Sequence, residues 1–348
     1  MIHRRMSQPI YIGGVTVGGG APVVVQSMTK TDTRDAMATV EQIRRLERCG
    51  CQLVRLAVPD GEAAAAIATI KPLTSIPIIA DIHFDYRLGI LAIESGADCL
   101  RLNPGNIRDQ EQLTAVVLAA KERDIPIRIG VNAGSLPPAA SAEHTVPQHM
   151  VDAAMRYLKF MERLDFDLIK VSLKAFDVPD TVEANRLLAE RMPYPIHLGI
   201  TEAGTPMRGA IRSAVGIGIL LNDGIGDTIR VSLTGDPCDE VSAGYEILKS
   251  LNLSRRGPTL VSCPTCGRAE VDIMGLAVEV ERRLSNIDKS ITVAVMGCVV
   301  NGPGEARMAD VGIACGNGRG VIFRKGEQVR TVEEADFLTA LMEEVERL

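Results

Sequence analysis

The chain has 348 residues, and its 46% hydrophobic and 24% charged residues are typical of a globular protein large enough for two domains. Its net charge of −6 excludes a general nucleic-acid-binding role, and 3% aromatic residues with no tryptophan argue against a stacking surface for bases. Any anionic ligand would therefore need a local basic pocket.

The N-terminal segment predicts a short β-hairpin and no targeting signal. Strands at 11–12 and 15–17 flank Gly13-Gly14, and the apolar run is too short and glycine-rich for a signal-peptide core. No apolar run approaches the length of a transmembrane helix, so no membrane partner is expected. The eight cysteines lack the dense spacing of a disulfide scaffold. These features predict a cytoplasmic protein.

From about residue 20 to residue 257, short β-branched runs alternate with amphipathic helical stretches. Most runs are continuously apolar, as expected of parallel strands covered on both faces. The predicted strands are Val23–Thr29, Leu53–Val58, Ile76–Ile82, Cys99–Asn103, Ile127–Val131, Leu168–Leu173, Ile196–Ile200 and Thr228–Leu233. The predicted helices include Ala38–Cys49, Tyr86–Ser95, Gln110–Arg123, Val151–Leu164, Thr181–Arg191, Met207–Asp223 and Glu240–Leu251.

Eight such units predict a (β/α)8 TIM-type barrel over residues 1–257. The alternative is a doubly wound open sheet. It is disfavoured because no G-x-G-x-x-G motif follows the first strand.

Polar side chains occupy the C-terminal half of every predicted strand or the positions just beyond it. In a barrel these positions converge on the mouth, where active sites lie. A structural ion pair could explain any one buried charge, but it does not explain the whole series. The series comprises Gln26, Ser27, Thr29, Arg55, Asp81, His83, Arg101, Asn103, Arg128, Asn132, Lys170, Ser172, Lys174, His197, Thr201, Glu202, Arg230, Ser232 and Thr234.

Basic residues dominate this series and indicate the class of ligand. The cations taken into account are Arg55, Arg101, Arg128, Lys170 and Arg230, and they outnumber Asp81 and Glu202. Guanidinium groups suit phosphate oxygens, and several together suit a diphosphate. The mouth therefore predicts a small phosphorylated substrate whose hydroxyls are bound by amide, hydroxyl or carboxylate side chains.

A polar, helix-breaking segment, Ser254-Arg-Arg-Gly-Pro258, marks the predicted domain boundary. Residues 258–348 predict a small α+β domain. Its expected elements are a strand at Leu260–Cys263, a helix at Val271–Leu284, a strand at Ile291–Met296, a loop around Cys298, strands near Ala309–Ala314 and Gly320–Arg324, and a helix at Thr331–Leu348. The pattern Thr331-x-x-Glu334 predicts a capping box for that last helix.

Three cysteines and a carboxylate in this domain predict a metal site. They come from Cys263-Pro-Thr-Cys266-Gly and from Gly297-Cys298-Val-Val-Asn-Gly-Pro-Gly-Glu305. Three thiolates suit three irons of a [4Fe–4S] cluster and leave the fourth iron for a weaker ligand or a substrate. The glycine-rich loop favours this interpretation because its backbone N–H groups can approach the sulfides closely. A zinc site that adds Cys315 as fourth ligand is the alternative.

The other cysteines are outside this pattern. Cys49, Cys51 and Cys99 fall on predicted helices and strands and are interpreted as buried packing residues. Cys238, near the predicted barrel mouth, and Cys315 remain without an assigned role.

Four motifs together resemble the bacterial 4-hydroxy-3-methylbut-2-enyl diphosphate synthase family. They are Cys263-Pro-Thr-Cys266-Gly-Arg, the loop from Gly297 to Glu305 followed by alanine, Leu102-Asn-Pro-Gly-Asn106 and Gly199-Ile-Thr-Glu-Ala-Gly204. The resemblance covers essentially the whole chain, without the extra domain of the plant forms. It implies a two-electron reductive opening of 2-C-methyl-D-erythritol 2,4-cyclodiphosphate with loss of a hydroxyl, giving the linear allylic diphosphate and water.

The resemblance also implies cofactor, partners and residue roles. A [4Fe–4S] cluster would be held by Cys263, Cys266, Cys298 and Glu305, electrons would come from reduced flavodoxin or ferredoxin, and the protein would be a homodimer in which the cluster domain of one chain caps the barrel of the other. Glu305 and Glu202 would be the catalytic residues. The substrate contacts would be Arg55, Asp81, Arg101, Asn103, Arg128, Asn132, Lys170, Ser172, His197, Arg230 and Ser232. His83 is left outside this set.

Two functions of other classes remain open. One is a redox-inactive barrel transferase for a phosphorylated substrate, with a structural zinc domain. The other is a non-catalytic cluster protein that senses iron or oxygen. That second function leaves the basic mouth unexplained, and the sequence offers no DNA-binding element for it.

Overall fold

From a computed structural model of the chain we describe residues 2–103, 106–107, 109–136, 144–269, 271–285, 287–298, 300 and 302–348. The chain divides into two compact units, Met1–Ser254 and Arg255–Leu348, and each is described by itself. No helix in these residue ranges is both long enough and apolar enough to cross a membrane.

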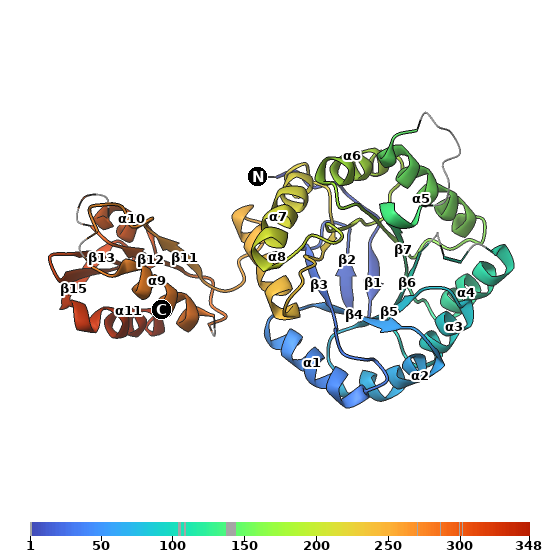
Figure 1. Cartoon of the computed structure of the whole chain (residues 1–348), viewed down its shortest axis with the longest axis horizontal. Coiled ribbons are helices and arrows are strands. Elements are labelled where there is room, and N and C mark those ends of the chain that lie inside the picture. Colours follow the sequence, from blue (N-terminus) through green and yellow to red (C-terminus); the bar gives the residue numbers. More distant parts are fainter. Residues whose placement is uncertain are drawn as a thin grey trace. The chain divides into compact units, whose positions relative to one another are not determined.

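The first unit is the predicted (β/α)8 barrel (Figure 1). Its strands are β3 (Val24–Met28), β4 (Leu53–Val58), β5 (Ile78–Ile82), β6 (Cys99–Leu102), β7 (Ile127–Asn132), β8 (Ile169–Lys174), β9 (His197–Leu198) and β10 (Thr228–Ile229). They are parallel and are ordered β8-β7-β6-β5-β4-β3-β10-β9. A parallel bridge between Val171 and Ile196 joins the two ends of that order. This closure excludes the doubly wound open sheet.

Eight helices surround the strands, as the ring in Figure 1 shows. They are α1 (Ala36–Arg48), α2 (Gly61–Ile70), α3 (Tyr86–Glu94), α4 (Gln110–Glu122), α5 (Val146–Glu162), α6 (Val178–Ala189), α7 (Pro206–Asn222) and α8 (Pro237–Ser250). The outward-facing strand residues pack against these helices and form the main apolar core. Helix α2 adds to the predicted set. Its alanine-rich sequence has little amphipathic contrast, because small side chains occupy both faces.

Aspartate caps fix where many of these helices begin. In α1, α2, α3, α4, α6 and α8 an Asp side chain accepts a hydrogen bond from a backbone N–H of the first turn. Helix α5 begins instead with a capping box between Thr145 and Gln148. Each cap satisfies donors that the helix itself cannot pair, and it follows a strand's C-terminal end. The caps therefore stabilise the end of the barrel where the polar side chains gather.

The predicted hairpin packs against the other end of the barrel. Strands β1 (Ile10–Ile12) and β2 (Val15–Val17) pair in antiparallel fashion and lie across the ring of Figure 1. Their buried side chains form a separate apolar cluster with residues from the N-terminal ends of four barrel strands: Val24, Leu53, Ile79 and Cys99. The hairpin thus covers the N-terminal end with apolar contacts, so the C-terminal end is the one available to a ligand.

The second unit is an α+β domain built on one sheet. The strands are β11 (Thr259–Ser262), β12 (Thr292–Met296), β13 (Val311–Gly316), β14 (Arg319–Arg324) and β15 (Glu327–Glu333), in that order. The pairs β11–β12 and β12–β13 are parallel, and the remaining pairs are antiparallel. The helices are α9 (Ile273–Leu284), α10 (Gly302–Met308) and α11 (Phe337–Glu346).

Two predictions for this unit are wrong. Thr331 lies in β15 opposite Val321, and the last helix begins at Phe337 without a side-chain cap. Pairing with β14 satisfies the backbone around Thr331, so the local capping pattern is overridden. Glu305, expected in a loop, lies in the first turn of α10. Gly312 permits this helix to approach, because a β-carbon there would lie 2.6 Å from the carbonyl oxygen of Ala306.

Replacing Ile12 with alanine should destabilise the barrel because this side chain is fully buried in the hairpin cluster. The expected cost is about 2–4 kcal/mol, which lowers the Tm measured by calorimetry by roughly 5–10 °C. Tyr11→Ala is the matched control, since Tyr11 is adjacent and 63% exposed. Equal shifts in the two variants would contradict a stabilising role for the covered end.

Candidate active site and candidate cluster site

Parallel register places a row of charged side chains inside the barrel. Asp81, Arg101, Arg128 and Lys170 are successive Cα partners across β5, β6, β7 and β8. Register partners project to the same face of a sheet, so the four side chains are neighbours. All four are buried, and Lys170 has no exposed surface. Arg128 and Lys170 are the second residues of β7 and β8, so these two lie in the N-terminal halves of their strands and not at the C-terminal ends, where the sequence placed the series.

Asp81 is the acidic centre of the row. Its carboxylate accepts a hydrogen bond from Arg101 Nη1 at 3.0 Å and lies 3.4 Å from Arg55 Nε. His83 Nε2 is 3.7 Å away, so the histidine that was left outside the predicted set does contact the row. Burial alone would raise the pKa of Asp81, but Arg55, His83 and Arg101 together hold it well below its usual value. Asp81 is therefore an anion that orients two arginines.

Several cationic donors in the row have no protein partner. Among the described residues, Arg128 Nε and Nη1, Lys170 Nζ and Arg101 Nε are buried and make no hydrogen bond. Burial lowers the pKa of Lys170 to about 8, with Arg128 contributing to the lowering. Burial also lowers the pKa of Arg128, and the nearby Arg55 and Arg101 lower it further. Buried polar groups are normally paired, so these donors are suited to bind an anion.

Glu240 holds a second part of the basic surface, and sequence reasoning missed it. It lies on α8 and is 1% exposed. Its carboxylate lies 3.2 Å from Arg230 Nη2 and accepts hydrogen bonds from Ser27 Oγ and the Leu233 backbone N–H, both at 3.1 Å. A fully buried carboxylate with this many donors fixes the orientation of Arg230. No motif in α8 marks it, because the pairing with Arg230 and Ser27 depends on how α8 packs against the barrel.

Lys174 lies beside the row and extends the basic surface. The sequence placed it at a strand end, but it was not selected as a substrate contact. Its Nζ is 3.2 Å from His197 Nε2, and His197 Nδ1 is 2.7 Å from the Thr228 hydroxyl. With Lys174 protonated, Nε2 accepts and Nδ1 carries the ring proton. Burial and the nearby Lys174 keep the pKa of His197 well below its ordinary value, so the imidazole is neutral.

Two glycines make room for these long cations. A β-carbon at Gly130 would lie 2.6 Å from Arg101 Nε, and one at Gly199 would lie 2.5 Å from Lys174 Nζ. Both glycines belong to interior positions of the barrel, where other strands carry large side chains. Their missing side chains let the guanidinium and ammonium groups cross the interior.

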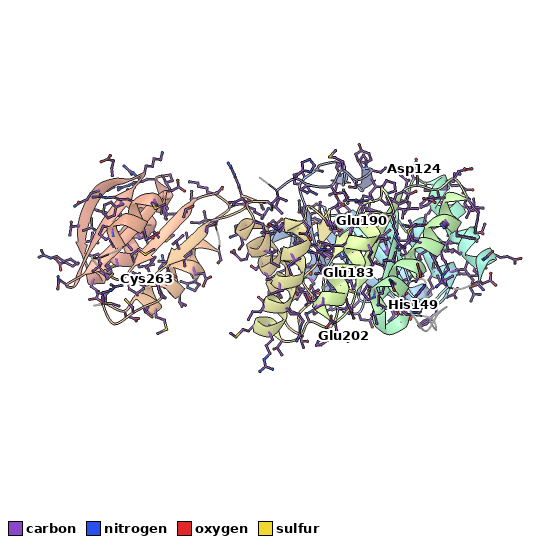
Figure 2. The ribbon with its side chains drawn as sticks, turned by 90° about the horizontal axis from the view of Figure 1, so that it is seen from above. Asp124, His149, Glu183, Glu190, Glu202 and Cys263 are labelled. Carbon is purple, nitrogen blue, oxygen red and sulfur yellow. The ribbon has the colours of Figure 1, made fainter. Side chains whose placement is uncertain are left out.

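The remaining predicted contacts lie nearer the mouth. Asn103 is buried and donates to Ser135 Oγ at 3.1 Å, Ser172 is buried with an unpaired hydroxyl, and Asn132 and Ser232 are partly exposed. Pro104 and Gly105 of the motif around Asn103 lie outside the described residues. Figure 2 shows Glu202 at the end of the barrel opposite Asp124.

Glu202 is exposed, follows β9, and has a left-handed backbone with a φ of 55°. Other non-glycine residues, among them Asp124 and Asp165, share this conformation, so it does not by itself mark a functional position.

The second unit contains a cavity of about 410 Å³ that brings the predicted cluster ligands together. Cys263, Cys266, Cys298 and Glu305 all line it. The Gly297 N–H donates to Cys263 Sγ at 3.3 Å, as expected of a glycine next to a metal-binding thiolate. Val299 and Asn301 of the same loop lie outside the described residues. Hydrogen bonds from the backbone and side chain of Arg268 lower the pKa of Cys266.

The donors of this site line a cavity and do not form one compact coordination sphere. Within the described ranges, no three His, Cys, Asp or Glu side chains are close enough together to hold a single ion. The four donors instead surround a cavity, which suits a larger group held at several corners. Cys315 does not line the cavity, is fully buried in the core of the unit, and has a pKa raised to about 12 by burial. The fourth ligand of the zinc alternative thus lies outside the cavity that the other three cysteines line.

Comparison with known proteins agrees with both units. The model of the GcpE TIM-barrel domain matches residues 7–245, and the model of the GcpE protein C-terminal domain matches residues 259–347. A Dehalococcoides mccartyi protein named 4-hydroxy-3-methylbut-2-en-1-yl diphosphate synthase (flavodoxin) is 62% identical, with 100% of both chains covered. A Geobacter sulfurreducens protein of the same name is 59% identical, covering 99% of this chain and 98% of the relative.

Among solved structures, a dihydropteroate synthase from Stenotrophomonas maltophilia is similar with a TM-score of 0.53. It covers 71% of this chain and 97% of its own, at 16% identity, so it supports the barrel fold alone. The two family models account for both units and their motifs, and the high-identity relatives extend along essentially the full length. The chain therefore belongs to the GcpE family and is an oxidoreductase of that family.

Proposed function

We propose that this chain catalyses the reductive opening and dehydroxylation of 2-C-methyl-D-erythritol 2,4-cyclodiphosphate to 4-hydroxy-3-methylbut-2-enyl diphosphate. The observation that supports this most directly is the set of buried cationic donors in the barrel that make no hydrogen bond among the described residues: Arg101 Nε, Arg128 Nε and Nη1, and Lys170 Nζ. Such a set needs an anion of high charge density, and a diphosphate supplies it. The relatives named as the synthase favour this particular diphosphate.

The barrel, residues 1–257 in this proposal, binds and orients the substrate. Arg55, Arg101, Arg128, Lys170 and Arg230 neutralise the two phosphates and the charge released when the ring opens. Asp81 and Glu240 keep the arginines oriented before the substrate arrives, so little reorganisation accompanies binding. Asn103, Asn132, Ser172, Ser232 and His197 contact the phosphates and hydroxyls.

Residues 258–348 hold the redox group in this proposal. Cys263, Cys266, Cys298 and Glu305 are the residues that would hold a [4Fe–4S] cluster. When bound, the cluster supplies two electrons and one iron whose ligand can be exchanged. A carboxylate is a harder and more labile iron ligand than a thiolate, so Glu305 would be the exchangeable ligand of the four. Its position in the first turn of a short helix leaves its side chain exposed.

Carboxylates also supply the proton that the reaction needs. Two electrons enter, a carbon–oxygen bond to phosphate breaks, and the departing hydroxyl takes up a proton to leave as water. Glu305, once released, can donate that proton, and Glu202 lies at the open end of the barrel where a substrate hydroxyl would lie. Reduced flavodoxin or ferredoxin would provide the electrons, as the relatives' names suggest for flavodoxin. A homodimer would bring the cluster of one chain to the barrel of another.

Arg128→Gln should weaken binding of the cyclic diphosphate at least tenfold, measured by titration calorimetry, because it removes charge-assisted hydrogen bonds worth about 1.5–3 kcal/mol. Iron content should not change, since Arg128 belongs to the barrel unit. Arg123→Gln, an exposed arginine that follows α4, is the matched control and should bind normally. Unaltered affinity in Arg128→Gln would place the diphosphate site elsewhere.

Affinity for the cyclic diphosphate should fall as pH rises above about 8. Lys170 is cationic below its lowered pKa of about 8 and neutral above it, so the attraction for phosphate is lost on the alkaline side. The Kd should rise about tenfold between pH 8 and pH 9.5, after correction for substrate titration. Lys170→Gln should bind more weakly at neutral pH and lack this alkaline loss. An identical pH profile in the two proteins would exclude Lys170 as the titrating group.

The cluster ligands can be separated from the proton donor by two substitutions. Cys298→Ser should lower iron and sulfide content and change the EPR spectrum of the reduced protein, whereas Glu305→Ala should keep a cluster and lose most turnover. Cys315→Ser is the matched control, because this thiol does not line the cavity. Full iron content in Cys298→Ser, or normal turnover in Glu305→Ala, would refute the corresponding role.

A further inference from the structure

Two cysteines from different helices meet on the outside of the barrel. Cys49 directly follows α1, and Cys238 is the second residue of α8. Their Sγ atoms are 2.6 Å apart, although 189 positions separate them in the chain. A disulfide bond has an S–S distance of about 2.05 Å, so only a small movement separates this dithiol from a bond. Cys49 was expected to be a buried packing residue, and it is instead half-buried against another thiol.

The surroundings make this pair the reactive dithiol of the barrel unit. Both thiols are partly exposed, whereas Cys51 and Cys99 are buried at 3% and 0% exposure. Arg45 contacts the pair, and a hydrogen bond with Cys238 raises the pKa of its guanidinium. A neighbouring cation favours the thiolate form that reacts with oxidants. Burial and the hydrogen bond with Cys238 raise the pKa of Cys49 to about 12.

Other contacts already hold the two helices in this position. Arg45 forms an ion pair with Asp236, the cap of α8, and the Tyr245 hydroxyl donates to the Gly50 carbonyl oxygen at 2.8 Å. Bond formation therefore asks for little displacement of α8. Glu240, two residues after Cys238, can keep its contact with Arg230 when the sulfurs join.

We propose that Cys49 and Cys238 form a reversible disulfide under oxidising conditions and thereby fasten α1 to α8. With hydrogen peroxide as oxidant, the two thiols give up two electrons and two protons, the O–O bond breaks, the S–S bond forms and two waters leave. A dithiol reductant reverses the reaction by exchange. Because the bond would close a loop that contains most of the barrel, it lowers the conformational entropy of the unfolded chain and thereby stabilises this unit. The proposal depends on the outer surface of the barrel and not on the proposed reaction.

Peptide mapping of the full chain tests the connection. The reduced protein is treated with hydrogen peroxide, free thiols are blocked with N-ethylmaleimide, and the protein is digested with trypsin. Cys49 falls in the peptide 49–55, which also contains Cys51, and Cys238 is the single cysteine of the peptide 231–249. We expect the two peptides to be linked, with a mass two hydrogen atoms below their sum, and fragmentation should assign the link to Cys49. Dithiothreitol should release the two peptides. Cys51→Ser should keep the linkage, and Cys49→Ser and Cys238→Ser should lose it.

Calorimetry tests the stabilisation separately. Oxidised wild type should have a Tm about 5 °C above reduced wild type, with the difference removed by dithiothreitol. Cys238→Ser contains the same second unit and should show no such increase, and Cys238→Ala repeats the comparison if the serine variant folds poorly. Alkylation of both thiols after oxidation, a link through Cys51, or an unchanged Tm would overturn the proposal.

Discussion

The burial of uncompensated positive charge inside the barrel is the constraint on which the rest of this structure depends. Six cations, Arg55, Arg101, Arg128, Lys170, Lys174 and Arg230, lie at its interior positions, and the described carboxylates that contact them are Asp81 and Glu240. Removing charge from water is costly without a partner, and the lowered pKa values of Arg128, Lys170 and Lys174 reflect that cost. An anion that binds in this space offsets the free-energy cost of burying the cations, so ligand binding stabilises the folded barrel.

The barrel can carry this charge because its apolar core lies elsewhere. The outward faces of the strands pack against the helices, and the hairpin cluster covers the N-terminal end. The interior of the barrel is therefore free to be polar. Parallel register then aligns Asp81, Arg101, Arg128 and Lys170, and the missing side chain of Gly130 gives Arg101 its path. One face of the strands thus packs against the helices and stabilises the fold, and the opposite face carries the side chains for ligand binding.

The second unit likewise keeps its apolar core apart from its candidate functional site. Its apolar core lies around β12, β13 and α11, while Cys263, Cys266, Cys298 and Glu305 line a cavity to which β11, α10 and their adjoining loops contribute. The backbone N–H of Gly297 reaches the sulfur of Cys263. The missing side chain of Gly312 lets helix α10 approach the sheet. A large redox group suits this arrangement because ligands from several segments can reach it without sharing one compact coordination sphere.

The sequence by itself determined the barrel, the hairpin and the identity of most polar residues at the strand ends. Parallel strands buried on both faces are continuous apolar runs, and charges that interrupt such runs are conspicuous. The C-terminal capping pattern at Thr331 failed because strand pairing overrode it, and Glu305 was placed in a loop because α10 depends on contact with Gly312. Glu240, the contact of Lys174 with His197, and the meeting of Cys49 with Cys238 were decided only by tertiary structure. Local sequence determines the periodicity of each element and its caps. Which side chains from distant segments become neighbours is determined by how the barrel closes.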